Sequence, residues 1–276
     1  MILISGADGF IGEELRKLLS KKKIPYKKIK TRQILKKKKV FFKKISHFIH
    51  LGFNFYRKKN NFSKDKNLIY IKKIINLAKI FKFKIIFPST STYKYKGKKK
   101  IISNKIYPYD KYSLSKVNCE KILKRFQKKN DGDVTILRIF NVYGKNQRPG
   151  WLIPDVIKQF SNKKNTFVKL KHYQNTRDFI HVKDVSNAIY KSLKLKGLKI
   201  LNVGSSQETT ILKVAEIISY ELNSNKKIVY LKKKSKNNSI SKADISNTKK
   251  ILKWKPSIKI EAGLKKILQH EKKIKN

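Results

Sequence analysis

The chain has 276 residues, and its 70 lysines and arginines against 17 acidic residues give a formal net charge of +53 at pH 7. This length suffices for one large core or two modest lobes. There is no run of about 18 apolar residues and no basic stretch before the apolar start, so we expect neither a membrane span nor a signal peptide. The single cysteine, Cys119, excludes an internal disulfide framework and fits a cytoplasmic protein.

The positive charge comes almost entirely from lysine. The chain has 63 lysines and 7 arginines, and the lysines are spread along it instead of forming one tail or stripe. Abundant lysine, isoleucine and asparagine with little alanine, glycine or arginine is the composition that an AT-rich genome produces. We therefore expect a solvated lysine surface with weak, salt-sensitive attraction to polyanions, and no specific nucleic-acid partner.

The first half of the chain alternates short apolar strands with helices. Strands are predicted at residues 1–5, 27–31, 40–42, 47–51, 84–87 and 134–140. Helices are predicted at residues 11–20, 67–81 and 112–128. This alternation is typical of a parallel, doubly wound sheet and places the chain in the α/β class.

The pattern loosens from about residue 144, where prolines and glycines interrupt it. Further strands are predicted at residues 179–182 and 200–203, and further helices at residues 211–222 and 261–270. The lysine-rich residues 232–238 are expected to form an exposed loop, and no internal repeat is present.

Three of the eleven glycines, Gly6, Gly9 and Gly12, lie between the first strand and the first helix. In a dinucleotide-binding turn, such glycines permit a sharp turn, close approach of a pyrophosphate to the backbone, and packing of helix on strand. The spacing here is GxxGxxG, and a tight strand-to-helix turn without a ligand is the alternative.

Tyr112 and Lys116 stand four residues apart on one face of a predicted helix. A nearby ammonium favours the phenolate of a tyrosine, so the pair could exchange a proton with a sugar hydroxyl. The spacing alone discriminates little, because six tyrosines have a lysine four residues later. The surrounding PYDKYSLSKVNCE singles out Tyr112.

Nine segments, in order, resemble the extended short-chain dehydrogenase/reductase superfamily of nucleotide-sugar epimerases, dehydratases and reductases. They are GADGFIG at 6–12, HLGF at 50–53, the helix led by Asn67, FPSTST at 87–92, YSLSK at 112–116, LRIFNVYG at 137–144, RDFIHVKDV at 177–185, NVG at 202–204 and KADISNTKKILKWKP at 242–256. The resemblance implies a Rossmann-type domain at 1–143, with a returning segment at about 177–203. It also implies a smaller C-terminal α/β substrate-binding lobe at about 144–176 and 204–276.

The resemblance also implies roles for individual residues. Thr90 would hydrogen-bond the reacting hydroxyl or ketone, with Ser89 and Ser91 as alternatives for that role and Ser91 as a substrate contact. Tyr112 would be the acid/base and Lys116 its partner. The residues implied to bind NAD or NADP are Gly6, Gly9, Phe10, Ile11, Gly12, Arg32, Leu51 and Lys116. Asn141 and Arg177 would contact the substrate diphosphate, although Arg177 could instead form an ion pair with Asp178 or Asp184.

Three departures from the family pattern narrow the expectation. Thr31 and Arg32 stand where NAD-preferring members carry an acid, which tilts the cofactor toward NADP, although Arg32 could equally stack on adenine or face solvent. YKYKG at 93–97 replaces the common VYG, and Ser91 and Thr92 replace the Asp–Glu pair of dehydratases, which disfavours dehydration. The five histidines lack metal-ligand spacing, so no metal is expected.

These features predict a cytoplasmic NAD(P)-dependent enzyme that acts on a nucleotide-linked sugar at C4, as a 4-epimerase. An NADPH-dependent 4-keto-sugar reductase is the alternative reaction. An RNA-binding or catalytically silent member of the same fold is the alternative of another class. Members of this family often form dimers through paired helices, so the resemblance also implies a homodimer.

Overall fold

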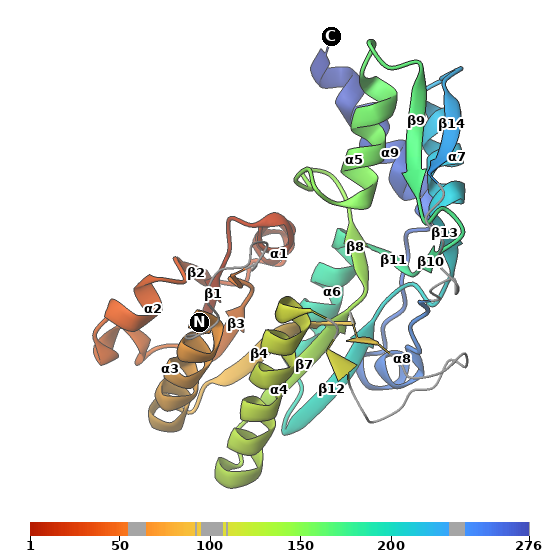
Figure 1. The fold of residues 1–276 in the computed structure, drawn as a ribbon. Helices are drawn as coiled ribbons and strands as arrows, with labels where there is room; N and C mark the ends of the chain where they lie inside the picture. The colour runs from red at the N-terminus through yellow and green to blue at the C-terminus, as the bar shows by residue number, and fades with distance from the viewer. Residues whose placement is uncertain (55–64, 92, 95–106, 109, 232–240, 276) are drawn as a thin grey trace. The chain divides into compact units, whose positions relative to one another are not determined.

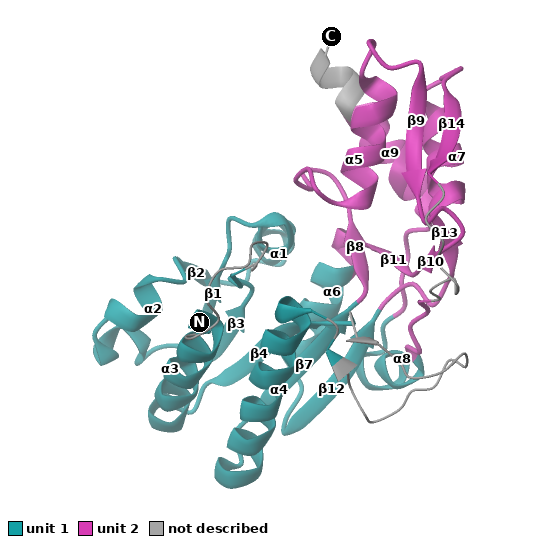
Figure 2. Cartoon of the chain, in the orientation of Figure 1, with its two compact units in different colours: residues 1–139, 185–203, 246–254 teal, residues 140–184, 204–245, 255–276 magenta. Residues whose placement is uncertain are grey.

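A computed structural model of the chain describes residues 1–54, 65–91, 93–94, 107–108, 110–231 and 241–275. The chain divides into two compact units (Figure 2). Unit 1 consists of Met1–Ile139, Val185–Val203 and Ser246–Trp254, and unit 2 consists of Phe140–Asp184, Gly204–Ile245 and Lys255–Asn276. Within the described residues, no helix has the length and apolar character to cross a membrane.

Unit 1 contains a parallel six-stranded sheet, which confirms the predicted α/β class (Figure 1). Its strands are β1 (Ile2–Ser5), β2 (Tyr26–Ile29), β3 (His47–His50), β4 (Lys84–Thr90), β7 (Val134–Ile139) and β12 (Leu198–Val203), in the order β12-β7-β4-β3-β1-β2. The strand order reverses between β1 and β3. In open α/β sheets, ligands bind at the carboxyl ends of the strands that flank such a point.

Helices on this sheet follow from the apolar spacing of their sequences. They are α1 (Phe10–Lys21), α2 (Gln33–Lys36), α3 (Lys66–Phe81), α4 (Lys111–Asn130), α6 (Val182–Ser192, which begins in unit 2) and α8 (Ser246–Leu252). A large core joins α2, α3 and α4 to one face of the sheet. The short strands β5 (Tyr93–Lys94) and β6 (Tyr107–Pro108) pair with each other.

One predicted strand is wrong. Residues 40–42 belong to a 3-10 helix, η1 (Lys39–Phe42), and not to the sheet. Val40 is 71% exposed while Phe42 is fully buried in the core of unit 1. The apolar run therefore anchors a short connection through one aromatic ring, and the β-branched valine that suggested a strand lies in solvent.

Unit 2 packs three helices against a small parallel sheet. The helices are α5 (Leu152–Ser161), α7 (Ile211–Glu221) and α9 (Ile260–Lys275), and the paired strands are β9 (Phe167–Lys171) and β14 (Lys227–Leu231). Two further pairs are β8 (Asn141–Tyr143) with β11 (Phe179–His181), which is parallel, and β10 (Thr176–Arg177) with β13 (Thr209–Thr210), which is antiparallel. The predicted loop at 232–238 lies outside the described residues.

The unit boundaries differ in detail from the domain limits expected from the resemblance. Unit 1 ends at Ile139 and resumes at Val185, whereas the expected limits were residue 143 and about residue 177. The reason is the parallel pairing of β8 with β11, which holds both segments within unit 2. The assignment of a cofactor role to one unit and a substrate role to the other remains a prediction.

Candidate functional site

The glycine turn between β1 and α1 leaves no room for side chains at two of its positions. Gly6 has φ +69°, and a Cβ there would lie 2.6 Å from Gly52 Cα. A Cβ on Gly12 would lie 2.7 Å from the Ala7 carbonyl carbon. Gly9 is the N-cap of α1, and a Cβ there would sit 3.2 Å from Gly6 O. The turn therefore needs glycine for close packing of backbone on backbone.

The N-terminus of α1 presents main-chain donors. No side chain caps this helix end, so the N–H groups at Phe10, Ile11 and Gly12 can meet an anion. This backbone cradle fits the pyrophosphate of a dinucleotide, since the donors and the helix dipole both favour negative charge. The cofactor roles predicted for these residues fall together at this one turn.

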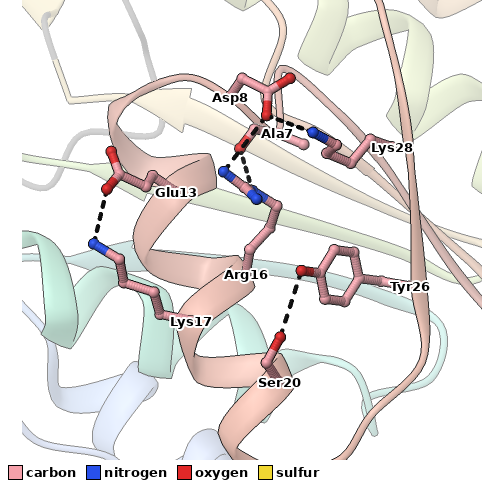
Figure 3. Close-up of polar contacts among 8 residues, drawn as sticks. All are labelled: Ala7, Asp8, Glu13, Arg16, Lys17, Ser20, Tyr26 and Lys28. Carbon is pink, nitrogen blue, oxygen red and sulfur yellow. Dashed lines mark hydrogen bonds and ion pairs between the residues drawn. The ribbon is translucent and has the colours of Figure 1, made fainter.

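Asp8, inside the turn, contacts two basic side chains (Figure 3). Its carboxylate accepts a hydrogen bond from Lys28 Nζ at 2.9 Å and pairs with Arg16 at 3.5 Å. The hydrogen bond from Lys28 lowers the pKa of Asp8, and the charges of Lys28, Arg16 and Lys30 act in the same direction. Arg16 Nε also donates to Ala7 O at 2.9 Å, so a side chain from α1 braces the turn.

The segment after β3 connects the glycine turn to the tyrosine–lysine pair. Leu51 N donates to Ser5 O at 3.0 Å, and a side chain on Gly52 would clash with Thr31. Phe53 then packs edge-on against Tyr112, with 5.6 Å between the ring centroids and 89° between the ring planes. The predicted nucleotide turn and the predicted catalytic pair therefore lie at the same edge of one sheet.

Helix α4 begins at a point that sets the direction of Tyr112. Asp110 is the N-cap, its side chain accepts from Ser113 N at 2.7 Å, and the Ser113 hydroxyl returns a contact to Asp110 N at 3.0 Å. This reciprocal capping box fixes the first turn of the helix. Tyr112 in that turn forms a side-chain hydrogen bond with Thr90 at the end of β4. Desolvation and the charge of Asp110 raise the pKa of Tyr112 above its ordinary value, and the bond to Thr90 opposes them.

Lys116 is buried one turn farther along α4. Its ammonium donates to Pro88 O at 2.6 Å and lies over the ring of Phe53, 3.7 Å from the centroid. Burial lowers the pKa of Lys116 to about 7, and the nearby Cys119 and Glu120 act in the opposite direction. Burying an ammonium is costly, and a strongly perturbed pKa of this kind makes a lysine a candidate for a functional residue.

Glu120 was not predicted as a site residue, yet it continues the same helix face. Its carboxylate accepts from Ser89 Oγ at 2.6 Å and from Arg138 at 2.7 Å. Three residues of α4, spaced four apart, thus hold three consecutive residues of β4: Tyr112 holds Thr90, Lys116 holds Pro88 and Glu120 holds Ser89. The i, i+4, i+8 spacing in the sequence was a signal for this, although it could not identify the partners.

The three candidate residues at the end of β4 make different hydrogen bonds. Ser89 Oγ donates to Glu120 at 2.6 Å, and the main-chain N–H of Ser91 donates to Ile139 O at 3.1 Å in β7. The side chain of Thr90 forms a hydrogen bond with Tyr112. Which of Ser89, Thr90 and Ser91 contacts the reacting oxygen therefore remains a prediction, with Thr90 as the first candidate.

Arg32 is exposed at the N-cap of α2, two residues beyond Lys30. Thr31, between them, packs its hydroxyl against Gly52, so the segment after β2 reaches the switch point of the sheet. Residues 30–32 contain two cations and no acid, as the sequence indicates.

Asn141 and Arg177, the predicted contacts of the substrate diphosphate, both lie in unit 2. Asn141 N donates to Asp178 O at 3.0 Å, and its Nδ2 donates to the same oxygen at 3.2 Å. Arg177 donates to Thr176 O at 2.8 Å. The carboxylate of Asp178 accepts from main-chain N–H groups of Ser205, Ser206 and Ala243. The carboxylate of Asp184 accepts from Ser257 and Ile258. Both acids named as alternative partners of Arg177 thus hold loops of unit 2.

Two of the histidines, His50 and His181, are buried. His50 is fully buried, with Nδ1 2.6 Å from Ser5 Oγ, and burial lowers its pKa to about 3. His181 is also buried, and burial lowers its pKa to about 4. Across the part of the chain that the structure describes, no group of three or more His, Cys, Asp or Glu side chains is arranged to hold a metal ion.

The sheet order, the glycine turn at its switch point and the tyrosine–lysine pair define a Rossmann-type α/β protein with a dinucleotide-type turn. A model of the NAD dependent epimerase/dehydratase family matches residues 2–204. The chain belongs to that family, within the extended short-chain dehydrogenase/reductase superfamily.

Relatives with different reactions match at nearly the same level. A UDP-glucuronate 4-epimerase from Thermodesulfobacterium geofontis is 30% identical over 166 residues, which are 60% of this chain and 51% of the relative. A dTDP-4-dehydro-6-deoxyglucose reductase from Escherichia coli is 29% identical over 168 residues, 59% of this chain and 53% of the relative. The chain thus aligns with about half the length of each.

Solved structures share the fold over nearly the whole chain. UDP-glucuronic acid 4-epimerase from Bacillus cereus, solved with UDP-glucuronic acid and NAD, superposes with a TM-score of 0.85 and 22% identity over 99% of each chain. RMD from Pseudomonas aeruginosa, solved with NADPH, gives a TM-score of 0.84 and 20% identity over 97% of each chain. At these identities, the likeness is one of fold.

Proposed function

We propose that the chain binds NAD(P) and catalyses hydride transfer at C4 of a nucleotide-linked sugar, with 4-epimerisation as the first candidate reaction. The observation that carries this proposal is the set of ties between β4 and α4 beside the glycine turn. They hold a tyrosine, a lysine and a threonine hydroxyl at the carboxyl edge of the sheet. Family membership and the relatives' names support the substrate class.

The cofactor is proposed to lie with its pyrophosphate on the N–H groups at the start of α1. Gly6, Gly9 and Gly12 keep side chains out of that space, and Leu51 and Arg32 flank it from the segments after β3 and β2. A bound nicotinamide would accept a hydride from the sugar carbon or deliver one to it. Lys116 is proposed as a second contact of this cofactor.

The protein's own residues manage the proton. Thr90 would orient the reacting sugar oxygen, and Tyr112 would exchange a proton with it through the phenolic oxygen. The raised pKa of Tyr112 keeps its proton on the phenol, while the positive charge of Lys116 favours the anion. Ser91, Asn141 and Arg177 are proposed as substrate contacts, the last two through the diphosphate.

Reduction of a 4-keto sugar nucleotide with NADPH is the second candidate. Two observations favour it: a phenol that retains its proton is ready to donate it, and residues 30–32 offer cations and no acid to a 2′-phosphate. An epimerase must run proton transfer in both directions, whereas a reductase needs donation alone.

A substrate panel tests the proposal. The purified chain is incubated with UDP-, GDP-, dTDP- and CDP-sugars, with 4-keto sugar nucleotides and with NAD⁺ or NADPH. NMR detects an epimerised product, and absorbance follows the oxidation of NADPH. Epimerisation supports the first candidate and NADPH consumption the second. RNA affinity that survives moderate salt, without any cofactor binding, would contradict both.

A further inference from the structure

The ammonium of Lys116 is surrounded by aromatic rings. Within the described part of the chain, its Nζ lies 3.7 Å from the ring centroid of Phe53, 4.6 Å from that of Phe87 and 5.8 Å from that of Tyr112. One carbonyl, Pro88 O, accepts a hydrogen bond from it at 2.6 Å. The three N–H donors of a lysine are therefore met by one oxygen and a cage of ring faces.

Ring faces and buried hydrocarbon affect an ammonium in opposite ways. Burial removes water and penalises the charge, whereas the negative face of an aromatic ring attracts a cation within about 6 Å. Phe53 is the closest ring, and it sits in the segment after β3, outside both elements that carry the lysine and its carbonyl partner. Its place is fixed by packing against Tyr112 and against Phe87, whose centroid is 6.2 Å away.

Other titratable groups around Lys116 come from two elements. Tyr112, Cys119 and Glu120 share its helix, and the last two raise the pKa of Lys116 against the larger effect of burial. His50 at the end of β3 faces it, and the lysine charge contributes to the lowered pKa of that histidine. On β4, the ammonium contacts the Phe87 ring and the Pro88 carbonyl, and neither group titrates.

We propose that Phe53 is a positioning residue whose ring keeps Lys116 in its charged form and holds the ammonium beside Tyr112. The consequence for catalysis rests on the proposed function, because it assumes that Tyr112 exchanges the proton. The statement about the charge of Lys116 does not depend on any reaction, so it can be tested on the protein without substrate or cofactor.

The first experiment measures stability at two pH values. Phe53→Leu keeps an apolar side chain and removes the ring face. The free energy of unfolding is measured by urea denaturation at pH 5 and pH 9, in the wild type and in a Lys116→Met background. At pH 9, above the folded pKa of about 7, the lysine is neutral and the substitution costs only packing. At pH 5 the lysine is charged, so Phe53→Leu also removes a ring face that contacts the Lys116 ammonium.

We expect the loss of the Phe53 ring to lower the pKa of Lys116 by about one further pH unit. The unfolding equilibrium constant of Phe53→Leu, relative to wild type, should be about tenfold larger at pH 5 than at pH 9. This pH-dependent part should vanish in the Lys116→Met background, where no charge remains. An equal cost at both pH values in the wild-type background would overturn the proposal, whatever the size of that cost.

Two variants control for packing. Phe41→Leu removes another half-buried ring under a lysine, with Lys37 Nζ 5.2 Å from the centroid, but that lysine lies at the surface. Water solvates it, so the cost should be the same at both pH values. Phe53→Tyr keeps the ring face, so its change in the free energy of unfolding, relative to wild type, should be the same at both pH values. A cost that depends on pH in Phe41→Leu would contradict the assignment. So would a cost in Phe53→Tyr that depends on pH as strongly as that of Phe53→Leu.

The second experiment uses turnover with the substrate that the panel identifies. If a charged Lys116 assists Tyr112, the high-pH limb of kcat/KM should move down by about one pH unit in Phe53→Leu and stay in place in Phe53→Tyr. An unmoved limb would overturn the catalytic part of the proposal. If no nucleotide sugar is turned over, the proposed function fails, and the stability experiment still decides the role of Phe53.

Discussion

Two tyrosines with raised pKa values, one in each unit, show how differently the units use the same side chain. Tyr143 in unit 2 is 1% exposed, its hydroxyl donates to Lys259 O at 3.4 Å, and its ring fills the space above Gly263. Tyr112 in unit 1 keeps part of its surface exposed and bonds to the side chain of Thr90. Burial is the largest cause of the raised pKa in both. The two tyrosines therefore differ in the partner of the hydroxyl and not in the direction of the pKa shift, and we propose a chemical role for Tyr112 alone.

Buried charges differ between the units in the same way. Asp178 in unit 2 meets main-chain N–H groups of two loops, which satisfy the carboxylate almost completely. Lys116 in unit 1 meets one carbonyl and ring faces. The carboxylate of Asp178 thus ties loops together, whereas the perturbed ammonium of Lys116 makes it a candidate for a functional residue.

The largest expected effect separates the two tyrosines. Tyr112→Phe should lower turnover by about 10²- to 10⁴-fold, because it removes the proposed proton donor and acceptor. Its free energy of unfolding should fall by about 1 kcal/mol, because the hydrogen bond to Thr90 is lost. Tyr143→Phe should keep turnover and lose about 1 kcal/mol of stability, because the hydroxyl contact with Lys259 O is lost. Equal losses of turnover in the two variants would contradict the distinction.

The second effect concerns the satisfied acid. Asp178→Ala should lower the free energy of unfolding by about 3 kcal/mol or more, since three buried main-chain N–H groups lose their acceptor. Asp178→Asn keeps one acceptor oxygen and should cost less. Urea denaturation, followed with a probe in unit 2, measures both. A cost for Asp178→Ala below that of Asp178→Asn would show that the loops do not depend on this carboxylate.

A smaller effect is expected at the third residue of the α4 face. Glu120→Gln should cost about 2 kcal/mol of stability, because Arg138 loses its charged partner at a site that is only partly exposed. Turnover should fall less than in Tyr112→Phe, because Glu120 holds Ser89 in β4 and does not itself contact the reacting sugar oxygen in the proposed mechanism. A double-mutant cycle with Ser89→Ala should give an interaction of about 1 kcal/mol. Additive effects would mean that the two side chains are energetically independent.

The smallest effect tests the cofactor preference. Arg32→Ala should weaken NADPH binding by about fivefold and leave NADH binding unchanged, as expected for one exposed cation beside a phosphate. Lys36→Ala, another exposed cation at the end of α2, serves as the matched control and should change neither. Titration of intrinsic fluorescence gives both affinities. A parallel loss for NADH and NADPH would show that Arg32 does not read the 2′-phosphate.

The sequence by itself determined the elements whose signal is local. The strands of the six-stranded sheet, the helices α1, α3 and α4, the glycine turn and the tyrosine–lysine pair were predicted because apolar spacing, glycine clustering and i, i+4 spacing are properties of neighbouring residues. The helices α2, α6 and α8 were not predicted. The predicted strand at residues 40–42 failed for the same reason. Its apolar run is short, and only the burial of Phe42 in the core decided that it forms a 3-10 helix.

The tertiary structure decided which distant segments meet. The pairing of β8 with β11 places both strands in unit 2, and the hydrogen bond between Tyr112 and Thr90 joins α4 to the end of β4. The position of Phe53 over Lys116 joins residues more than sixty positions apart, which no periodicity records. Local patterns specify what each segment is, while contacts between segments arise only when the whole sheet has packed, and the proposed chemistry depends on those contacts.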